Sequence, residues 1–284
     1  MQVVDFHTHI FSPSLIAERE IYIRRDRWFG ALYGNPKARM ADAEGLIASM
    51  TEAGVAQAVA FGFAFADAGL CREGNDYVLQ AAARYPDRIL PFAVVNPCLG
   101  EAALREARRC LEGGALGLGE LMPDGQGFAL DDFERLDPLM ALAREHGVPT
   151  LFHVNEQVGH GYHGKGTQGP ERAYALAMRY PDNVIVLAHW GAGLPFYELM
   201  PEVRAALRNV YYDTAASIYL YEDAVFRHVM AWAPTKVLWA TDYPLATQSR
   251  CLRRLRRAGL DEGELLRLLD RNAHAILPGT HGPP

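Results

Sequence analysis

Eight short apolar segments alternate with helical patterns along nearly the whole chain, and this alternation limits the fold more than any other feature. The apolar segments predict strands at 2–7, 56–62, 88–95, 115–120, 148–153, 183–189, 209–213 and 236–241. The patterns between and after them predict helices at 42–53, 73–85, 100–112, 131–146, 170–180, 195–207, 219–232 and 248–258, with an extra C-terminal helix at 261–276. Segments such as 184–187 are apolar throughout, which is typical of parallel strands covered by helices on both faces. The sequence therefore predicts one α/β domain over residues 1–284, a single (β/α)₈ TIM barrel with a long insertion between strand 1 and helix 1.

An open, doubly wound sheet is the alternative α/β architecture. That fold requires a glycine-rich nucleotide-binding turn after its first strand, whereas residues 7–11 (His-Thr-His-Ile-Phe) contain no glycine. The barrel is favoured because it also accounts for the polar residues at the strand ends.

Candidate metal ligands stand at the carboxyl ends of strands 1, 4, 5, 6 and 8. Because side chains alternate along a strand, His7 and His9 point to the same face and can bind one cation. A lone His-x-His pair can equally be two packed or exposed imidazoles. The complete set favours a metal site, because a barrel brings its strand ends together. Its members are His7, His9, Glu120, His153, His189 and Asp242.

The composition argues against several classes of protein. The net charge of −6 over 284 residues argues against the concentrated basic face that nucleic-acid binding needs. The arginines between 250 and 257 have helical spacing and are interpreted as a solvated helix face. No segment reaches the ~20 apolar residues of a membrane span, and the four separated cysteines fit reduced thiols. We expect a soluble, cytoplasmic protein with no nucleic-acid or membrane partner.

The chain resembles the amidohydrolase superfamily, in particular its branch of small metal-dependent hydrolases and decarboxylases. The resemblance spans nearly the whole chain and rests on motifs in a fixed order: DFHTH at 5–9, His153, HWG at 189–191, TDYP at 241–244 and RNA at 271–273. It implies that His7, His9, His153 and Asp242 hold a divalent metal, usually zinc, and that His189 sits beside it.

These residue types also suit a catalytic metal on chemical grounds. Imidazole and carboxylate ligands fit zinc or a similar divalent ion, and a catalytic site keeps one coordination position open. Bound metal lowers the pKa of water toward ~7. Asp242 and His189 are then the candidate catalytic base and acid.

Glu120 bears on the type of reaction. The resemblance implies that decarboxylases of this branch have no metal ligand on strand 4, whereas hydrolases with two metals place a bridging group there. Glu120 as a metal ligand therefore favours hydrolysis, with one firm site and a weaker second site. The alternative is that Glu120 only orients a ligand through a hydrogen bond.

The glycine-rich segment 155–167, which follows strand 5, is a candidate substrate-binding loop. Its His160, His163 and Lys165 can fold over an anionic group of a small substrate, and Asn155 and Trp190 are further candidates for substrate contact. A mobile surface loop with solvated charges is the alternative.

The segment 11–41 is long for a connection inside one domain, and it is rich in aromatic residues. These properties are typical of a functional element rather than of disorder. It is expected to be either a lid or an oligomer contact, and the resemblance implies a homodimer as one alternative.

The expected function is hydrolysis of a small anionic ester, lactone or amide by a metal-activated water. The alternatives are metal-dependent non-oxidative decarboxylation or hydration of a small carboxylic acid, and a non-catalytic barrel that binds a ligand.

Overall fold

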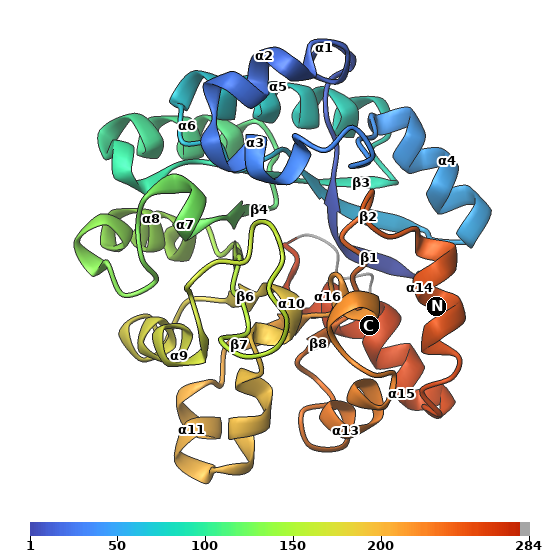
Figure 1. Ribbon diagram of the computed structural model, residues 1–284. Coiled ribbons are helices and arrows are strands. Elements are labelled where there is room, and N and C mark those ends of the chain that lie inside the picture. Colours follow the sequence, from blue (N-terminus) through green and yellow to red (C-terminus); the bar gives the residue numbers. More distant parts are fainter. Residues whose placement is uncertain (279–284) are drawn as a thin grey trace.

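The computed structural model describes residues 1–278 and contains eight parallel strands, each paired with the next in chain order (Figure 1). The strands are β1 (Val4–His9), β2 (Gln57–Phe61), β3 (Ile89–Ala93), β4 (Gly117–Leu121), β5 (Thr150–Phe152), β6 (Ile185–Leu187), β7 (Val210–Asp213) and β8 (Val237–Leu238). The ring closes where the Phe6 amide donates to the Trp239 carbonyl over 2.9 Å and Thr8 pairs with Tyr243. A strand occurs at each predicted position, and the predicted α/β barrel is confirmed.

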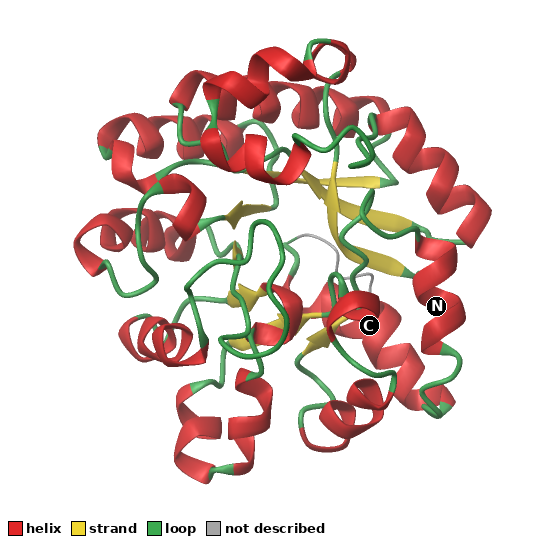
Figure 2. Ribbon diagram, in the orientation of Figure 1, coloured by secondary structure: helices red, strands yellow, loops and turns green. Residues whose placement is uncertain are grey.

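Helices form a ring outside the strands (Figure 2). Those between the strands include α4 (Ala43–Ala53), α5 (Ala68–Arg84), α6 (Glu101–Glu112), α8 (Phe133–Glu145), α9 (Pro170–Arg179), α11 (Pro201–Ala206), α13 (Ala224–Trp232) and α14 (Gln248–Leu255). Single turns occur at η1 (Pro97–Leu99), α7 (Pro123–Gln126), α10 (Ala188–Gly191) and α12 (Ser217–Leu220), and a 3₁₀ segment at η2 (Leu194–Leu199). The predicted C-terminal helix consists of α15 (Glu262–Leu266), a π-helical segment η3 (Arg267–Arg271) and α16 (Asn272–Ile276).

Local sequence explains where several helices begin and end. The Asp42 carboxylate accepts from the Gly45 amide at the start of α4, and Asp67 accepts from the Leu70 amide at the start of α5. Gly54 has a φ of 72° and ends α4 in the left-handed conformation that glycine adopts at low cost. The chain can therefore turn from α4 directly into β2.

The insertion between β1 and α4 folds into three short helices rather than an irregular connection. They are α1 (Pro13–Ala17), α2 (Arg19–Arg25) and α3 (Arg27–Tyr33). The Phe29 ring is fully buried and lies 5.1 Å from the Phe63 ring and 4.7 Å from the Tyr33 ring, measured between centroids. This aromatic packing fixes α3 at the mouth of the barrel (Figure 1).

Two predicted helices are interrupted. The segment 195–207 is divided between η2 and α11, because Met200 is extended before Pro201, as a residue preceding proline prefers. The segment 219–232 is divided between α12 and α13, with Tyr221 extended between them.

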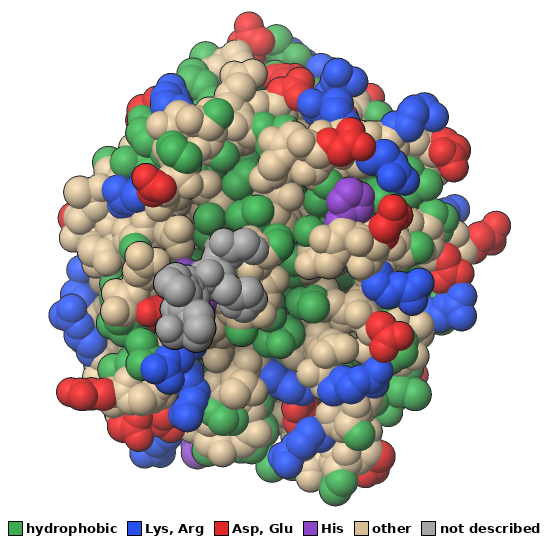
Figure 3. All heavy atoms as spheres, turned by 180° about the vertical axis from the view of Figure 1, so that it is seen from behind, with side chains coloured by type: hydrophobic (Ala, Val, Ile, Leu, Met, Phe, Trp, Pro, Cys, Tyr) green, Lys and Arg blue, Asp and Glu red, His purple; other side chains and the backbone are tan. Residues whose placement is uncertain are grey.

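The outer surface of the barrel carries mixed charges. On the face seen from behind, Lys and Arg side chains are interspersed with Asp and Glu side chains (Figure 3). None of the helices within residues 1–278 is both long enough and apolar enough to cross a membrane.

Candidate metal centre

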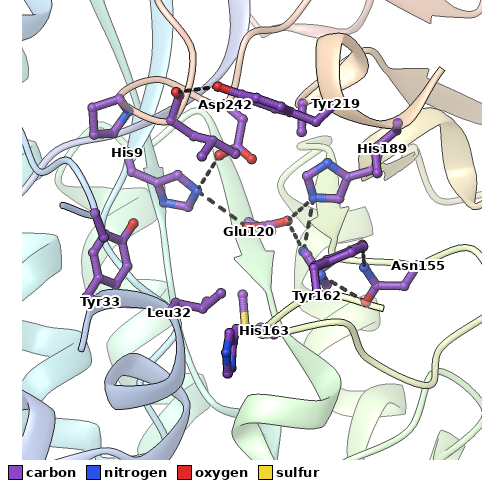
Figure 4. A pocket seen from close by; sticks show the side chains of 18 of the residues that line it. His9, Leu32, Tyr33, Glu120, Asn155, Tyr162, His163, His189, Tyr219 and Asp242 are labelled. Atoms are coloured by element: carbon purple, nitrogen blue, oxygen red, sulfur yellow. Dashed lines mark hydrogen bonds and ion pairs between the residues drawn. The ribbon is translucent and has the colours of Figure 1, made fainter. Parts of the chain in front are cut away.

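The barrel brings the six candidate ligands together at the carboxyl ends of its strands, in two groups. Figure 4 labels four of them, His9, Glu120, His189 and Asp242. His7, His9 and Asp242 form one group, and Glu120, His153 and His189 form the other; within each, the donor atoms lie within 4.8 Å of one another. His7 and His9 belong to β1 and Glu120 to β4, whereas His153, His189 and Asp242 follow β5, β6 and β8.

The first group, together with Glu120, has the spacing of a coordination shell. The Nε2 atoms of His7 and His9 are 3.3 Å apart, and Asp242 Oδ1 is 3.7 and 3.4 Å from them. Glu120 Oε2 is 3.6 Å from His7 Nε2 and 3.7 Å from His9 Nε2. Donors about 2.0–2.2 Å from a tetrahedral zinc ion lie about 3.3–3.6 Å from one another. The four atoms therefore fit around one divalent ion.

The hydrogen bonds of the two β1 histidines support this fit. His7 Nδ1 donates to Asp213 Oδ2 over 2.8 Å, and His9 Nδ1 faces the Gly62 carbonyl at 3.4 Å. With the protons on these Nδ1 atoms, both neutral rings turn Nε2 lone pairs toward the Asp242 carboxylate. Acceptors that face one another in this way require a cation between them, either a proton or a metal ion.

The second group is a similar cluster of acceptors. His189 Nδ1 donates to the Ala215 carbonyl over 3.1 Å, which leaves His189 Nε2 as a lone pair 3.1 Å from His153 Nδ1. His153 Nδ1 is also 2.8 Å from Glu120 Oε1, and its Nε2 is 3.1 Å from Asn155 Oδ1. One neutral imidazole has a single proton and cannot serve both oxygens. A cation at His153 Nδ1 resolves the conflict and leaves the proton for Asn155.

Glu120 lies between the two groups, with Oε2 facing the β1 histidines and Oε1 facing His153 and His189. Gly119 makes this position accessible. Its φ is 113°, and a Cβ there would overlap the Leu151 carbonyl of β5. Glycine thus allows β4 to approach β5 closely just before the carboxylate.

The carboxylates of the site are held ionised. Burial raises the pKa of Glu120, but the charges of nearby imidazoles, His7 first, hold it well below its usual range. Burial likewise raises the pKa of Asp242, but the hydrogen bond from His9 and the charge of His7 bring it down to about 2.

The same interactions act on the imidazoles with the opposite sign. Burial lowers the pKa of His7, but Glu120 and Asp213 together raise it to about 9. Burial lowers the pKa of His189, but the hydrogen bond with Glu120 and the charge of Asp242 raise it to about 10. A metal ion at this site therefore competes with protons on these rings.

Asp213 is a part of the site that the sequence analysis did not identify. It ends β7, is fully buried, and accepts from His7 Nδ1 through Oδ2 and from the His189 amide through Oδ1. The available signal was a carboxylate at the end of the seventh apolar segment.

A pocket of about 430 Å³ opens in front of the two ligand groups. Its wall includes Leu32 and Tyr33 of the insertion and, from the segment after β5, the predicted contact residues Asn155, His160 and His163 (Figure 4). The insertion therefore forms part of the wall of this pocket.

Lys165 and Trp190, predicted to contact substrate, are not among the residues that line this pocket. The Lys165 ammonium donates to the carbonyls of Val158 and His160 over 2.8 and 3.1 Å, which fixes the loop itself. Trp190 is fully buried, and its indole donates to Ser217 Oγ over 2.7 Å. Both His189 and Trp190 have left-handed backbone (φ 56° and 59°), and this turn directs Trp190 into the core.

The comparisons with known proteins agree with the fold. The amidohydrolase family model matches residues 4–279. The 5-carboxyvanillate decarboxylase of Sphingomonas paucimobilis shares 19% identity at a TM-score of 0.80, covering 97% of this chain and 98% of that chain. The 5-carboxyvanillate decarboxylase from Novosphingobium aromaticivorans DSM 12444, complexed with manganese and 4-hydroxy-3-methoxy-5-nitrobenzoic acid, shares 19% identity at a TM-score of 0.78. The match covers 97% of this chain and 95% of that chain. The 2,6-dihydroxybenzoate decarboxylase from Rhizobium shares 17% identity at a TM-score of 0.70, and the match covers 97% of this chain and 98% of that chain. No curated protein matches the sequence.

Proposed function

The chain belongs to the amidohydrolase family of metal-dependent enzymes, and from this premise we propose that it hydrolyses a small anionic ester, lactone or amide. The observation that carries the proposal is the position of Glu120, with one carboxylate oxygen on each of the two ligand groups. A carboxylate placed in this way bridges two metal ions in hydrolytic sites.

The donor set defines which residues would hold the ions. His7, His9 and Asp242 with Glu120 Oε2 form the firm site, and Glu120 Oε1 with the other two histidines forms the weaker one. Imidazole and carboxylate donors suit zinc and also manganese. Ions bound there would supply Lewis acidity toward the scissile carbonyl and a lowered pKa for water.

The residues of the chain supply positioning and proton transfer. The Asp242 carboxylate, ionised and at the floor of the pocket, can accept the proton of an attacking water and return it to the leaving group. Tyr33 lines the same pocket on the side of His9 (Figure 4). Its phenol is a neutral donor for a substrate oxygen, because burial and the charges of Asp242 and Glu120 raise its pKa above the ordinary value.

Decarboxylation of a small carboxylic acid is the second candidate. The three structural neighbours named above are decarboxylases, and one of them was solved with manganese. These comparisons support decarboxylation more than hydrolysis, whereas the position of Glu120 between the two ligand groups supports hydrolysis. In a decarboxylase, His189 would remain free to deliver the proton that replaces carbon dioxide.

Metal stoichiometry in wild type and in Glu120→Gln tests the choice. We expect wild type to bind one ion firmly and a second weakly, and Glu120→Gln to lose the second and weaken the first. Glu156→Gln, which removes a carboxylate outside both ligand groups, is the matched control. The same single metal with the same affinity in wild type and Glu120→Gln would show that Glu120 is not a ligand and would favour decarboxylation.

A product assay completes the test. The metal-loaded protein is incubated with a panel of esters, lactones, amides and aromatic carboxylic acids, and released acid and carbon dioxide are measured separately. Hydrolysis without carbon dioxide supports the proposal, and carbon dioxide release from a carboxylic acid overturns it in favour of the second candidate.

A further inference from the structure

A second cavity, of about 460 Å³, lies beside the mouth of the metal-centre pocket. The two cavities have Ala38, Arg39, Tyr219 and Leu245 in common as lining residues. A ligand in the first pocket can therefore extend into the second without leaving the protein surface.

The second cavity is lined by side chains of one charge sign. Its charged residues are Lys37, Arg39, Arg250 and Arg253, and no acidic side chain of residues 1–278 lines it. This concentration is notable in a chain with a net charge of −6. The sequence analysis placed Arg250 and Arg253 on a solvated helix face, whereas the structure places both against this cavity.

Three of the four cations that line the cavity have no carboxylate partner among the described residues. Arg254, on the same helix, forms an ion pair with Asp223. In contrast, the side chains of Lys37, Arg39 and Arg253 form no hydrogen bond or ion pair with any described residue. Their charges are available to a ligand.

Arg250 is held at the boundary between the two cavities. Its guanidinium donates to the Tyr219 hydroxyl over 3.1 Å and lies 5.3 Å from the centre of the Tyr219 ring. Tyr219 in turn donates to the Leu245 carbonyl over 3.4 Å. Tyr219 also lines the metal-centre pocket together with Asp242, so this contact links the basic cavity to that pocket (Figure 4).

The start of α14 adds to the positive potential. Thr247, the N-cap of α14, lines the cavity, and no side chain caps the free amides of the first turn. Amides at a helix N-terminus carry partial positive charge and bind anions. Arg250 and Arg253 are three residues apart and therefore lie on the same side of this helix.

We propose that this basic cavity, lined by Lys37, Arg39, Arg250 and Arg253, binds the anionic group of the substrate, a phosphate or a carboxylate. The apolar side chains of Leu32, Phe63 and Met122 line the pocket nearer the metal centre. The substrate class is thus an elongated molecule with an anionic end, an apolar middle and a hydrolysable group. The position of the reacting end rests on the proposed function, but the anion site itself does not.

Binding measured without turnover tests the proposal. Metal-free protein is titrated with inorganic phosphate and, separately, with succinate by calorimetry at low ionic strength, because salt screens such contacts. The variants are Arg250→Gln/Arg253→Gln and the matched control Arg256→Gln/Arg257→Gln, which makes the same charge change on adjoining residues that do not line the cavity. Circular dichroism verifies that both are folded.

We expect saturable binding of at least one anion, weakened about tenfold or more in Arg250→Gln/Arg253→Gln and nearly unchanged in the control, since the variant loses two charge-assisted contacts to the anion. If only phosphate binding depends on these two arginines, the substrate bears a phosphate group. If only succinate binding depends on them, the substrate bears a carboxylate group. Absence of saturable binding, or equal weakening in both variants, overturns the proposal. Arginine-dependent binding in a protein that hydrolyses no ester, lactone or amide would leave the anion site standing and contradict the proposed function.

Discussion

Asp213 contacts two metal-centre residues at once. Its Oδ1 accepts from the amides of His189 and Ala215 over 2.9 and 3.0 Å, and its Oδ2 accepts from His7 Nδ1. The first pair of bonds fixes the backbone after β6, and the last bond fixes the tautomer of a β1 ligand. The tautomer of His7 on β1 is therefore set by β7, and in the closed barrel β8 lies between these two strands.

Asp213→Asn is expected to lower metal affinity about 10- to 100-fold with little effect on the metal-free fold. The amide oxygen of Asn will keep the two backbone bonds, so its NH₂ group will face His7 Nδ1. His7 must then carry its proton on Nε2, where it blocks coordination. Metal affinity from competition with a chelator, compared with the Tm of the metal-free variant, checks this. A clear fall in the Tm of the metal-free variant, together with the loss of metal affinity, would indicate a merely structural role for Asp213.

Asp242 is the residue whose replacement should affect chemistry most. Asp242→Asn removes a base that acts in the transition state, so kcat should fall about 10²- to 10⁴-fold while KM changes little. Steady-state kinetics at saturating metal, with the best substrate of the panel, measures the split. A rise in KM alone would make Asp242 a binding residue.

At the scale of elements, the loop after β5 is attached to the metal centre through one side chain. Asn155 Oδ1 accepts from His153 Nε2 and from the Gly166 amide over 2.7 Å, and its Nδ2 donates to the Tyr162 hydroxyl over 2.9 Å. A Cβ at position 166 would collide with the Asn155 and Asp124 side chains. The loop therefore closes tightly around Asn155 because residue 166 is glycine.

Asn155→Ala should release this loop and loosen His153 together. We expect faster cleavage within 157–165 by a nonspecific protease and weaker binding at the second metal site, since both effects follow from one lost amide. Limited proteolysis with mass analysis and metal titration measure them. Gln157→Ala, which removes only the bond to the Asn155 carbonyl, is the control; equal effects in both variants would contradict the assignment.

The sequence predicted the positions of the strands and helices better than the contacts of side chains in the loops that connect them. Strand positions and the six candidate ligands follow from local patterns, because each candidate stands where an apolar segment ends. The burial of Trp190 could not be predicted, because it depends on the left-handed backbone at His189 and Trp190. Lys165 and Asp213 depend on contacts across loops and strands, and periodicity carries no information about such contacts.

At the scale of the whole molecule, the barrel is closed by a carboxylate that lies beneath the metal centre. Asp5 accepts from the Thr241 amide and hydroxyl over 3.0 and 2.6 Å and from Gln248 Nε2 over 3.1 Å. These bonds join β1 to the segment after β8 and to α14. Asp5 is fully buried, and burial raises its pKa to about 7 despite these donors.

This shifted pKa predicts how stability depends on pH. The pKa of Asp5 is above the unfolded value of 3.8, so its stabilising contribution is complete below pH 3.8 and is lost as pH rises through about 7. Asp5→Asn is neutral throughout and lacks this loss. Between pH 5 and 8, the free energy of unfolding of wild type should therefore fall by about 3 kcal/mol relative to the variant. Urea unfolding of metal-free protein measures this difference, and exposed Asp87→Asn should show no such trend. A constant difference between wild type and Asp5→Asn across this range would mean that Asp5 remains ionised in the fold, and that its donors outweigh burial.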